Sequence, residues 1–338
     1  MVKSMLVFRL LICTAIFPFV INILFSQSFN IKGQFWGSKI TGDDAYLENS
    51  FFESSLGYIP TFSLYEELDD NQMLDMEFSY RINYLFFENT LIREHEKLHR
   101  FWVRYSNNEL EARIGLQKIV FGPSQILRSL SWFDTIDLKD PTNQTEGVEA
   151  FRLRWFPSNS SALWLWLIMN EQNKFSQGGR GEFSSSIGEW GFTFHVDPSN
   201  NHDNHRMALD YRHDGLIGFW NENSKIKYNG LRTDMITVGA DYTLPFINGI
   251  LIMTESMFMS IEDNLTSSNQ YLSAFMSSLP IGMFHQFMVI FNLDWENNQS
   301  SNYLRWSSTY DSYSLNCMVS INPIEDGNSL QFMLIYNH

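Results

Sequence analysis

The feature that most constrains the fold of this chain is an alternation of apolar and polar residues with a period of two. Between Met76 and Tyr84, every second residue is apolar or aromatic, and polar residues such as Glu77, Ser79 and Arg81 lie between them. Because successive side chains of a strand point to opposite faces, this pattern predicts strands with one apolar and one polar face. The pattern recurs in segments of about ten residues, separated by clusters of Asn, Gly, Ser, Asp and Pro.

These repeated segments predict a transmembrane antiparallel β-barrel. The longest apolar run after residue 26 is Ala162 to Met169, far shorter than the ~20 residues of a membrane helix. The chain is 44% hydrophobic but only 18% charged, against about 25% charged residues in average soluble proteins. A soluble β-sandwich would also alternate, but it rarely has so many strands.

The number of strands follows from counting the segments. We count about seventeen, and because a single-chain bacterial barrel prefers an even number, we expect about sixteen strands, with fourteen as the second choice. Residues 171–186 are assigned to no strand.

Residues 1–26 resemble a cleaved signal peptide, which predicts export. Lys3 and Arg9 precede an almost wholly apolar stretch that ends at Phe25, and small polar residues follow it. An uncleaved anchor helix is the alternative. Residues 27–338 would then form a single domain, a barrel of the bacterial outer membrane in contact with its lipid and lipopolysaccharide.

The final segment also fits a bacterial outer-membrane barrel. It places Leu330, Phe332, Leu334 and Tyr336 on one face. Such an aromatic-tipped strand resembles the C-terminal signal that the barrel-assembly machinery recognises, so we expect that machinery as a partner.

One stretch breaks the alternation, the segment near residues 122–146. A loop in water would not carry so many large apolar residues, and long irregular segments of compact folds are usually functional or packed against other elements. We expect this segment to fold inside the barrel as a constriction or partial plug. Its large apolar residues are Ile126, Leu127, Leu130, Trp132, Phe133, Ile136 and Leu138.

The strands that flank this segment carry five arginines on the face away from lipid. Because a charge on the lipid face near the bilayer midplane costs ~2–4 kcal/mol, the apolar residues between them should face outward. The five are Arg100, Arg104, Arg113, Arg152 and Arg154.

The segment between these strands carries three acids, Asp134, Asp137 and Asp140. A basic wall that faces an acidic loop can form a constriction with a transverse field that filters polar solutes. Alternatively, the arginines pair with these aspartates and only hold the loop against the wall. The two interpretations are compatible.

The region 109–154 resembles part of the Gram-negative porin-like proteins, including alginate-porin-like families. In these proteins a Gly-Arg-Gln strand leads into an inward loop that ends in an Asp-Pro or Asn-Pro turn. The resemblance implies an outer-membrane channel or a polymer-binding barrel. It is carried by the run from Arg113 to Pro123, by Trp132-Phe133-Asp134, by Asp140-Pro141 and by Glu146-Gly147-Val148.

Other chemistry is weakly indicated. A group of acids and histidines near residues 195–214 could suggest a catalytic or metal site, but its spacing alone is a weak signal, and much of it lies in an Asn-rich loop. Glu255, inward on an apolar strand, is a candidate partner for a lumen arginine. We expect no enzyme activity, no cofactor and no metal. The group comprises His195, Asp197, His202, Asp203, His205, His213 and Asp214.

The function predicted from the sequence is passive diffusion of small hydrophilic solutes through an arginine-lined constriction. The alternative is a plugged barrel that binds surface polysaccharide or docks an assembly partner. Nucleic acid is not expected as a partner, because 38 acidic residues exceed 23 basic ones and phosphate binding needs a basic surface.

Overall fold

The computed structural model describes most of the chain after the N-terminal segment. The described residues are 28–43, 50–69, 71–169, 174–198, 204–246, 248–263, 266–322 and 327–338. Residues 1–26, for which the sequence predicts a signal peptide, lie outside the described residues.

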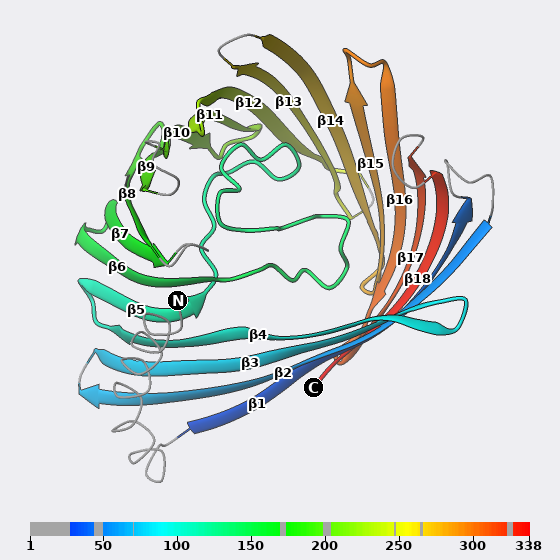
Figure 1. Cartoon of the computed structure of the whole chain (residues 1–338), viewed down its shortest axis with the longest axis horizontal. Coiled ribbons are helices and arrows are strands. Elements are labelled where there is room, and N and C mark those ends of the chain that lie inside the picture. Colours follow the sequence, from blue (N-terminus) through cyan, green and yellow to red (C-terminus); the bar gives the residue numbers. More distant parts are fainter. Residues whose placement is uncertain are drawn as a thin grey trace.

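The described residues form a barrel of eighteen strands, and each strand pairs with its neighbours in sequence (Figure 1). The strands are β1 (Ser28–Asp43), β2 (Ser50–Asp69), β3 (Gln72–Phe87), β4 (Thr90–Ser106), β5 (Leu110–Gln117), β6 (Val148–Ser158), β7 (Ser161–Met169), β8 (Phe175–Ser185), β9 (Gly188–Asp197), β10 (Asn204–His213), β11 (Gly218–Tyr228), β12 (Leu231–Leu244), β13 (Ile250–Glu262), β14 (Ser267–Ile281), β15 (His285–Asp294), β16 (Gln299–Thr309), β17 (Tyr313–Asn322) and β18 (Gly327–Asn337).

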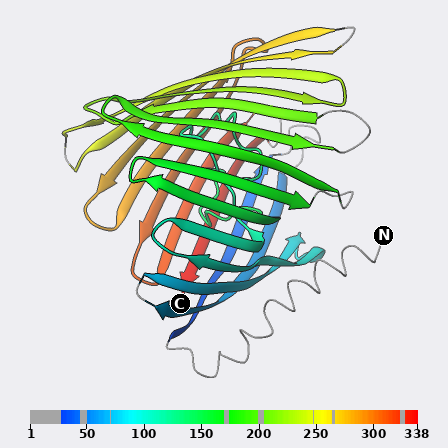
Figure 2. The ribbon, with the colours of Figure 1, turned by 90° about the vertical axis from the view of Figure 1, so that its left-hand side faces the viewer.

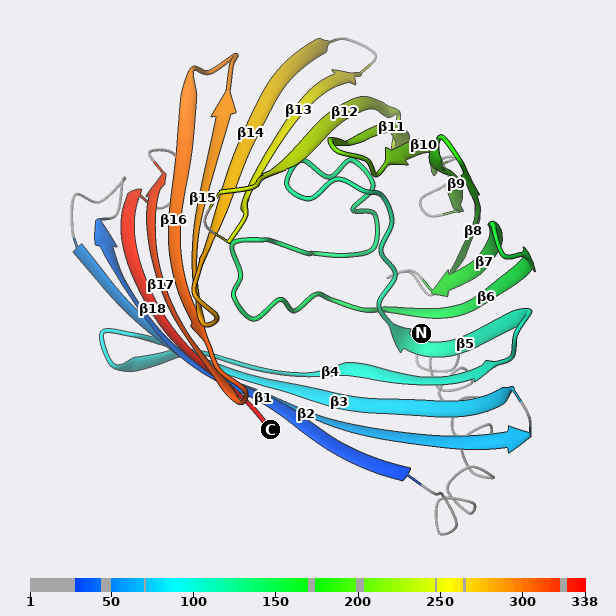
Figure 3. The ribbon, with the colours of Figure 1, turned by 180° about the vertical axis from the view of Figure 1, so that it is seen from behind.

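The sheet is closed because β1 pairs with both β2 and β18. Gly37 of β1 lies opposite Leu56 of β2 and opposite Leu334 of β18, and both pairings are antiparallel. The ring of strands is visible from both ends in Figures 1 and 3, and Figure 2 shows the inclined strands from the side. The architecture is therefore an up-and-down barrel without a free first or last strand, and the predicted antiparallel barrel is confirmed.

The predicted strand number, sixteen or fourteen, is wrong. The strand missing from the sequence prediction is β8, whose residues lie within 171–186. Its outward positions include Gln177, Gly179 and Gly181, so the strand lacks a continuous row of large apolar residues on its lipid side. The barrel does have an even number of strands, but it has one strand more than the seventeen segments counted in the sequence, not one fewer.

The two faces of the barrel differ as the alternation predicts. On β7, Leu163, Leu165 and Leu167 are exposed, whereas Trp166 and Ile168 at the alternate positions are buried on the inner side. An outward apolar surface is the arrangement of a barrel that spans a bilayer. Within the part of the chain that the structure describes, no helix is long and apolar enough to cross a membrane.

The regular succession of long strands joined by short turns is interrupted after β5. This strand has eight residues and pairs with β4 only between Phe101 and Ser106. Residues 118–147, hereafter the connecting segment, then join β5 to β6 without forming a strand. In Figure 1 the trace of the connecting segment lies within the ring of strands.

Candidate functional site

The connecting segment leaves the wall at a glycine that the geometry requires. Gly122 has a φ of +82°, in the left-handed region that favours glycine. A Cβ atom at this position would lie 2.2 Å from Oε1 of Glu222 on β11. The missing side chain therefore lets the backbone approach a wall carboxylate.

That carboxylate accepts hydrogen bonds from the connecting segment. Glu222 is fully buried. Its Oε1 accepts from the backbone N–H of Ser124 at 2.8 Å, and its Oε2 accepts from the N–H and the hydroxyl of Ser129 at 3.0 and 2.8 Å. A buried carboxylate is costly unless it is hydrogen-bonded, and here the donors come from the connecting segment.

A second buried carboxylate, that of Glu255 on β13, also accepts hydrogen bonds from the connecting segment. Oε1 of Glu255 accepts from the N–H of Gln125 at 2.7 Å, and Oε2 accepts from the N–H groups of Ile126 and Leu127 at 3.0 and 2.6 Å. The indole N–H of Trp220 completes the set at 3.1 Å. The suggestion that Glu255 pairs with a lumen arginine is therefore wrong, because backbone amides occupy its oxygens.

Strand β12, between these two strands, adds a third contact. The hydroxyl of Thr237 donates to the carbonyl of Leu127 at 3.0 Å. Three neighbouring strands thus hold residues 124–129 through both donors and acceptors.

An apolar cluster holds the residues of the connecting segment on either side of 124–129. Ile119, Phe121 and Leu130 of the connecting segment are buried, and the ring of Phe121 lies 5.1 Å from that of Trp166 on β7. The ring of Phe133 packs edge-on against His195 of β9 at 5.0 Å. Of the apolar residues that break the alternation in this stretch, Leu130, Trp132 and Phe133 therefore pack against the inner wall.

The remainder of the connecting segment is bound on other sides of the ring. The Arg305 guanidinium of β16 donates to the carbonyl of Leu138 at 3.0 Å, and that of Arg206 of β10 donates to the carbonyl of Trp132 at 3.2 Å.

The segment returns to the wall past β1 and β4. Gln144 donates to Gln34 of β1 at 2.9 Å, and Glu146 forms an ion pair with Lys97 of β4. Partial burial opposes ionisation of Glu146, but its hydrogen bond and charge pairing with Lys97 outweigh burial and lower the pKa of Glu146.

Four of the five predicted arginines gather on the inner face of β4, β5 and β6. Arg104 makes two hydrogen bonds to Asp75 of β3, at 2.8 and 2.6 Å. Arg104, Arg113 and Arg152 all form ion pairs with one carboxylate, that of Glu111.

Tryptophan rings cover part of this basic wall. The guanidinium carbon of Arg154 lies 3.9 Å from the ring centroid of Trp164, and that of Arg113 lies 4.2 Å from the centroid of Trp102. The Nε atoms of Arg113, Arg152 and Arg154 are buried and make no hydrogen bond.

Arg100 has a different role from the other four. Its guanidinium donates to the carbonyls of His99 and Thr145, each at 2.6 Å. It therefore ties the end of the connecting segment to β4 and is not part of the basic wall around Glu111.

The three aspartates of the connecting segment have local partners. Asp134 pairs with Arg128, and Asp137 lies 3.6 Å from Nζ of Lys139. Asp140 accepts from the N–H and the hydroxyl of Thr142 at 2.8 and 2.7 Å. The ion pairs of the wall arginines in the described residues go elsewhere, so the interpretation that these aspartates hold the arginines is wrong.

Sequence reasoning missed the true partners, Asp75 and Glu111. The signal was present for Glu111, because it lies two residues before Arg113 and so shares its face. Asp75 lies directly opposite Arg104 in the β3–β4 register. That pairing needs the register, which the alternation does not supply.

A cavity of about 490 Å³ lies between the connecting segment and strands β14–β16. Asp134, Asp137 and Lys139 line it from the segment, and Asp294 and Asn292 line it from the wall. The cavity with its acidic groups therefore lies between the connecting segment and β14–β16. The four wall arginines lie on a different part of the barrel, on β4–β6.

The histidines near residue 195 make structural contacts. His195 is buried, and its Nδ1 accepts from the indole N–H of Trp166 at 3.2 Å. His213 lies 3.1 Å from the carbonyl of Ile187. His202 and Asp203 lie outside the described residues. Among the residues that the structure does describe, no group of three or more His, Cys, Asp or Glu side chains is placed to hold a metal ion.

Comparison with known proteins identifies the fold. No protein-family model and no curated protein sequence matches the chain. OmpF of Salmonella typhi, in complex with daunomycin, is 8% identical with a TM-score of 0.59, covering 92% of this chain and 97% of that one. OccAB1 of Acinetobacter baumannii is 9% identical with a TM-score of 0.63, covering 93% and 97%. A mutant of the Rh. blastica porin is 9% identical with a TM-score of 0.51, covering 92% and 99%. The chain therefore has the closed β-barrel fold of the outer-membrane porins.

Proposed function

We propose that this protein is a channel of the bacterial outer membrane for passive diffusion of small hydrophilic solutes, narrowed by the connecting segment. The observation that carries the proposal is a closed barrel, apolar outside, in which an anchored segment joins the arginine-bearing strands β5 and β6 and borders a cavity of about 490 Å³. The porin fold supports this function. The proposed location also agrees with the export signal predicted for residues 1–26.

We place the filter of this channel at the arginine wall. Arg104, Arg113, Arg152 and Arg154 share one face of β4–β6. The first three form ion pairs with Glu111. Several positive charges in a narrow, low-dielectric passage raise the local concentration of anions. We expect the channel to favour anionic over cationic solutes of equal size.

Recordings in planar bilayers test both parts of the proposal. The purified protein should give stable conductance steps, and the reversal potential in a KCl gradient should show anion preference. Because Arg154 has no ion pair among the described residues, Arg154→Ala should lower the anion-to-cation permeability ratio by about two- to fivefold. Arg154→Lys keeps the charge and should retain most of the preference.

The matched control for these variants is Arg212→Ala, which removes an arginine that pairs with Asp214 near the β10–β11 turn. It should leave the permeability ratio unchanged. An unchanged ratio in both Arg154→Ala and Arg104→Ala would contradict the arginine filter. Absence of conductance from correctly folded protein would contradict the channel itself.

The second candidate is a plugged barrel that binds surface polysaccharide or docks an assembly partner. The observation that favours it is the spread of the anchors, because the connecting segment is hydrogen-bonded to β1, β4, β10–β13 and β16. A silent bilayer with folded protein would favour this alternative. In either case we propose a role without catalysis.

A further inference from the structure

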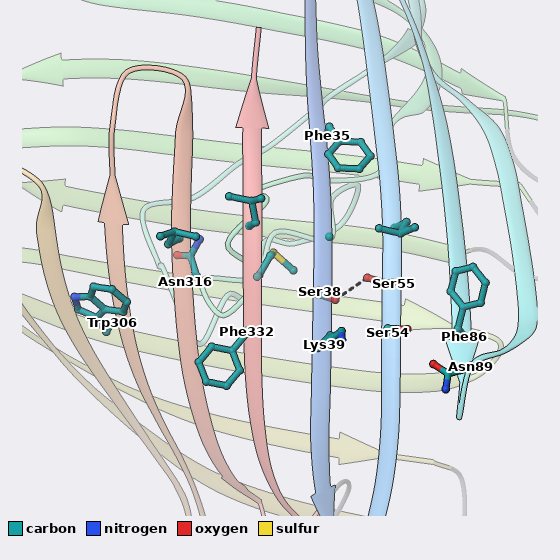
Figure 4. A pocket seen from close by; sticks show the side chains of 15 residues that line it. Phe35, Ser38, Lys39, Ser54, Ser55, Phe86, Asn89, Trp306, Asn316 and Phe332 are labelled. Atoms are coloured by element: carbon teal, nitrogen blue, oxygen red, sulfur yellow. Dashed lines mark hydrogen bonds between the residues drawn. The ribbon is translucent and has the colours of Figure 1, made fainter.

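A groove of about 910 Å³ lies on the outer face of the barrel, away from the connecting segment (Figure 4). It crosses the seam where β16–β18 meet β1–β3. Its lining is mostly apolar, with Phe35, Leu56, Leu315, Phe332 and Leu334. These side chains belong to the exposed face that contacts lipid.

The strand register explains the hollow. Gly37 of β1 lies between Leu334 of β18 and Leu56 of β2, and it contributes no side chain between them. Gly37 is half-buried with ordinary backbone geometry, and a Cβ atom there would lie 3.3 Å from Leu56. The backbone of Gly37, which has no side chain, therefore forms the floor of the groove between Leu334 and Leu56.

The next row of outward residues supplies polar groups. Lys39 lies opposite Phe332 of β18 and Ser54 of β2, and Ser54 lies opposite Phe86 of β3. Figure 4 shows Phe332, Lys39, Ser54 and Phe86 as a row across the four strands, with Asn89 beside Phe86.

Lys39 carries the positive charge of the groove. Its Nζ lies 5.6 Å from the ring centroid of Phe52 and makes no ion pair among the described residues. Lys39 is nearer to the end of β1 at Asp43 than Gly37 and Phe35 are. A cation on a lipid-facing surface is costly near the midplane and tolerable near the headgroups, where an anionic group can offset the cost.

We propose that this groove binds an anionic phospholipid of the surrounding membrane. The lipid phosphate contacts the Lys39 ammonium, with Ser54 and Asn89 as neighbouring polar groups, and an acyl chain lies over Gly37 between Leu56 and Leu334. The order of residues along β1 fits this orientation, because the charge is nearest the strand end and the apolar floor lies deeper. The site is on the outside of the barrel and does not depend on solute transport.

Native mass spectrometry of the full-length, detergent-solubilised barrel tests the proposal. The probes are dimyristoyl phosphatidic acid, dimyristoyl phosphatidylcholine with the same chains, and inorganic phosphate. The unmodified protein should retain one phosphatidic acid with clear preference over phosphatidylcholine. Lys39→Gln should reduce that preference about fivefold, the effect of one lysine near an anionic lipid.

Two further variants separate charge from shape. Gly37→Leu fills the floor and should weaken binding of both lipids. Lys32→Gln removes an exposed lysine from the same strand but from the opposite face, and it should bind lipid as the unmodified protein does. Folding of each variant is checked by the heat-dependent mobility of the barrel in detergent gels.

Each outcome decides the proposal. Unchanged lipid preference in Lys39→Gln would overturn it, as would an equal effect of Lys32→Gln. Displacement of the lipid by inorganic phosphate at millimolar concentration would identify a free-phosphate site instead. If Gly37→Leu does not fold, Lys39→Gln alone carries the test. Conductance is read separately, so a failed channel and an absent lipid site are distinguishable.

Discussion

At the scale of single residues, two buried glutamates do more to position the connecting segment than the five arginines that attract attention in the sequence. Glu222 and Glu255 are fully buried, and hydrogen bonds from the segment's backbone amides satisfy both. The phase of Glu255 on its strand showed that it faces inward. Its partners were not predictable, because an irregular segment leaves no periodic signal of where its amides point.

Replacing one of these carboxylates should weaken the anchoring. Glu255→Gln keeps the shape but leaves one acceptor oxygen and adds an N–H₂ group that faces backbone donors. We expect the free energy of unfolding to fall by about 2 kcal/mol or more, measured by urea unfolding in detergent with tryptophan fluorescence. Glu262→Gln, an exposed position on the same strand, is the control and should stay within about 0.5 kcal/mol. Equal stability of Glu255→Gln and the unmodified protein would contradict this role.

Gly122 offers a second test at this scale. Gly122→Ala puts a side chain at a φ of +82° and also 2.2 Å from Glu222, whereas Gly282→Ala has a φ of +63° with no atom within 4 Å. Gly282→Ala should cost about 1 kcal/mol from the backbone alone. Gly122→Ala should cost about 2 kcal/mol more, because Glu222 must move from its amide donors. Equal losses of unfolding free energy in the two variants would show that the close approach to Glu222 has no energetic weight.

At the scale of the element, the strands that could be predicted are those with a continuous outward row of large apolar residues. β7 is such a strand, and its outward leucines are exposed as expected. β8 is not, because glycines occupy outward positions and its inward face carries Arg180, which is bound to Asp210 of β10. A strand of this kind is stabilised by its backbone ladder and its inner contacts, and neither contributes to the hydropathy pattern.

The glycines of β8 should respond oppositely to substitution according to their face. Gly181 is outward, and a Cβ atom there meets only Leu163, at 3.6 Å. Gly181→Ala should therefore raise the unfolding free energy by about 0.5–1 kcal/mol, since it restricts the unfolded chain without a clash. Gly178 is inward, and a Cβ atom there would lie 2.4 Å from the carbonyl oxygen of Phe194, so Gly178→Ala should be destabilising. Urea unfolding of both variants checks the signs, and the same sign for both would contradict the assigned faces of β8.

At the scale of the whole molecule, the sequence was sufficient for an antiparallel barrel and for the arginine face, but not for the ion pairs across strands. Alternation reports only which side of its own strand a residue occupies. The pairing of Arg104 with Asp75 depends on register, and the convergence of three arginines on Glu111 depends on three strands at once. The irregular stretch 122–146 could be recognised in the sequence because it lacks the alternation. Its contacts could not be predicted, because they depend on which strands face it across the closed barrel.

The anchoring of the connecting segment has a consequence for the order in which the barrel can assemble. The amides of residues 124–129 find their acceptors 93 to 130 residues later in the chain, on β11 and β13. The bond from Arg305 to Leu138 spans 167 residues. Contacts this distant in sequence carry a large loop-closure entropy cost, which falls once the intervening strands have paired. A growing sheet that has added only its first ten strands therefore holds a connecting segment whose amides have no carboxylate acceptor from β11 or β13. The attachment of the connecting segment therefore requires β11, β13 and β16 in the sheet, and the pairing of β18 with β1 closes the ring around it.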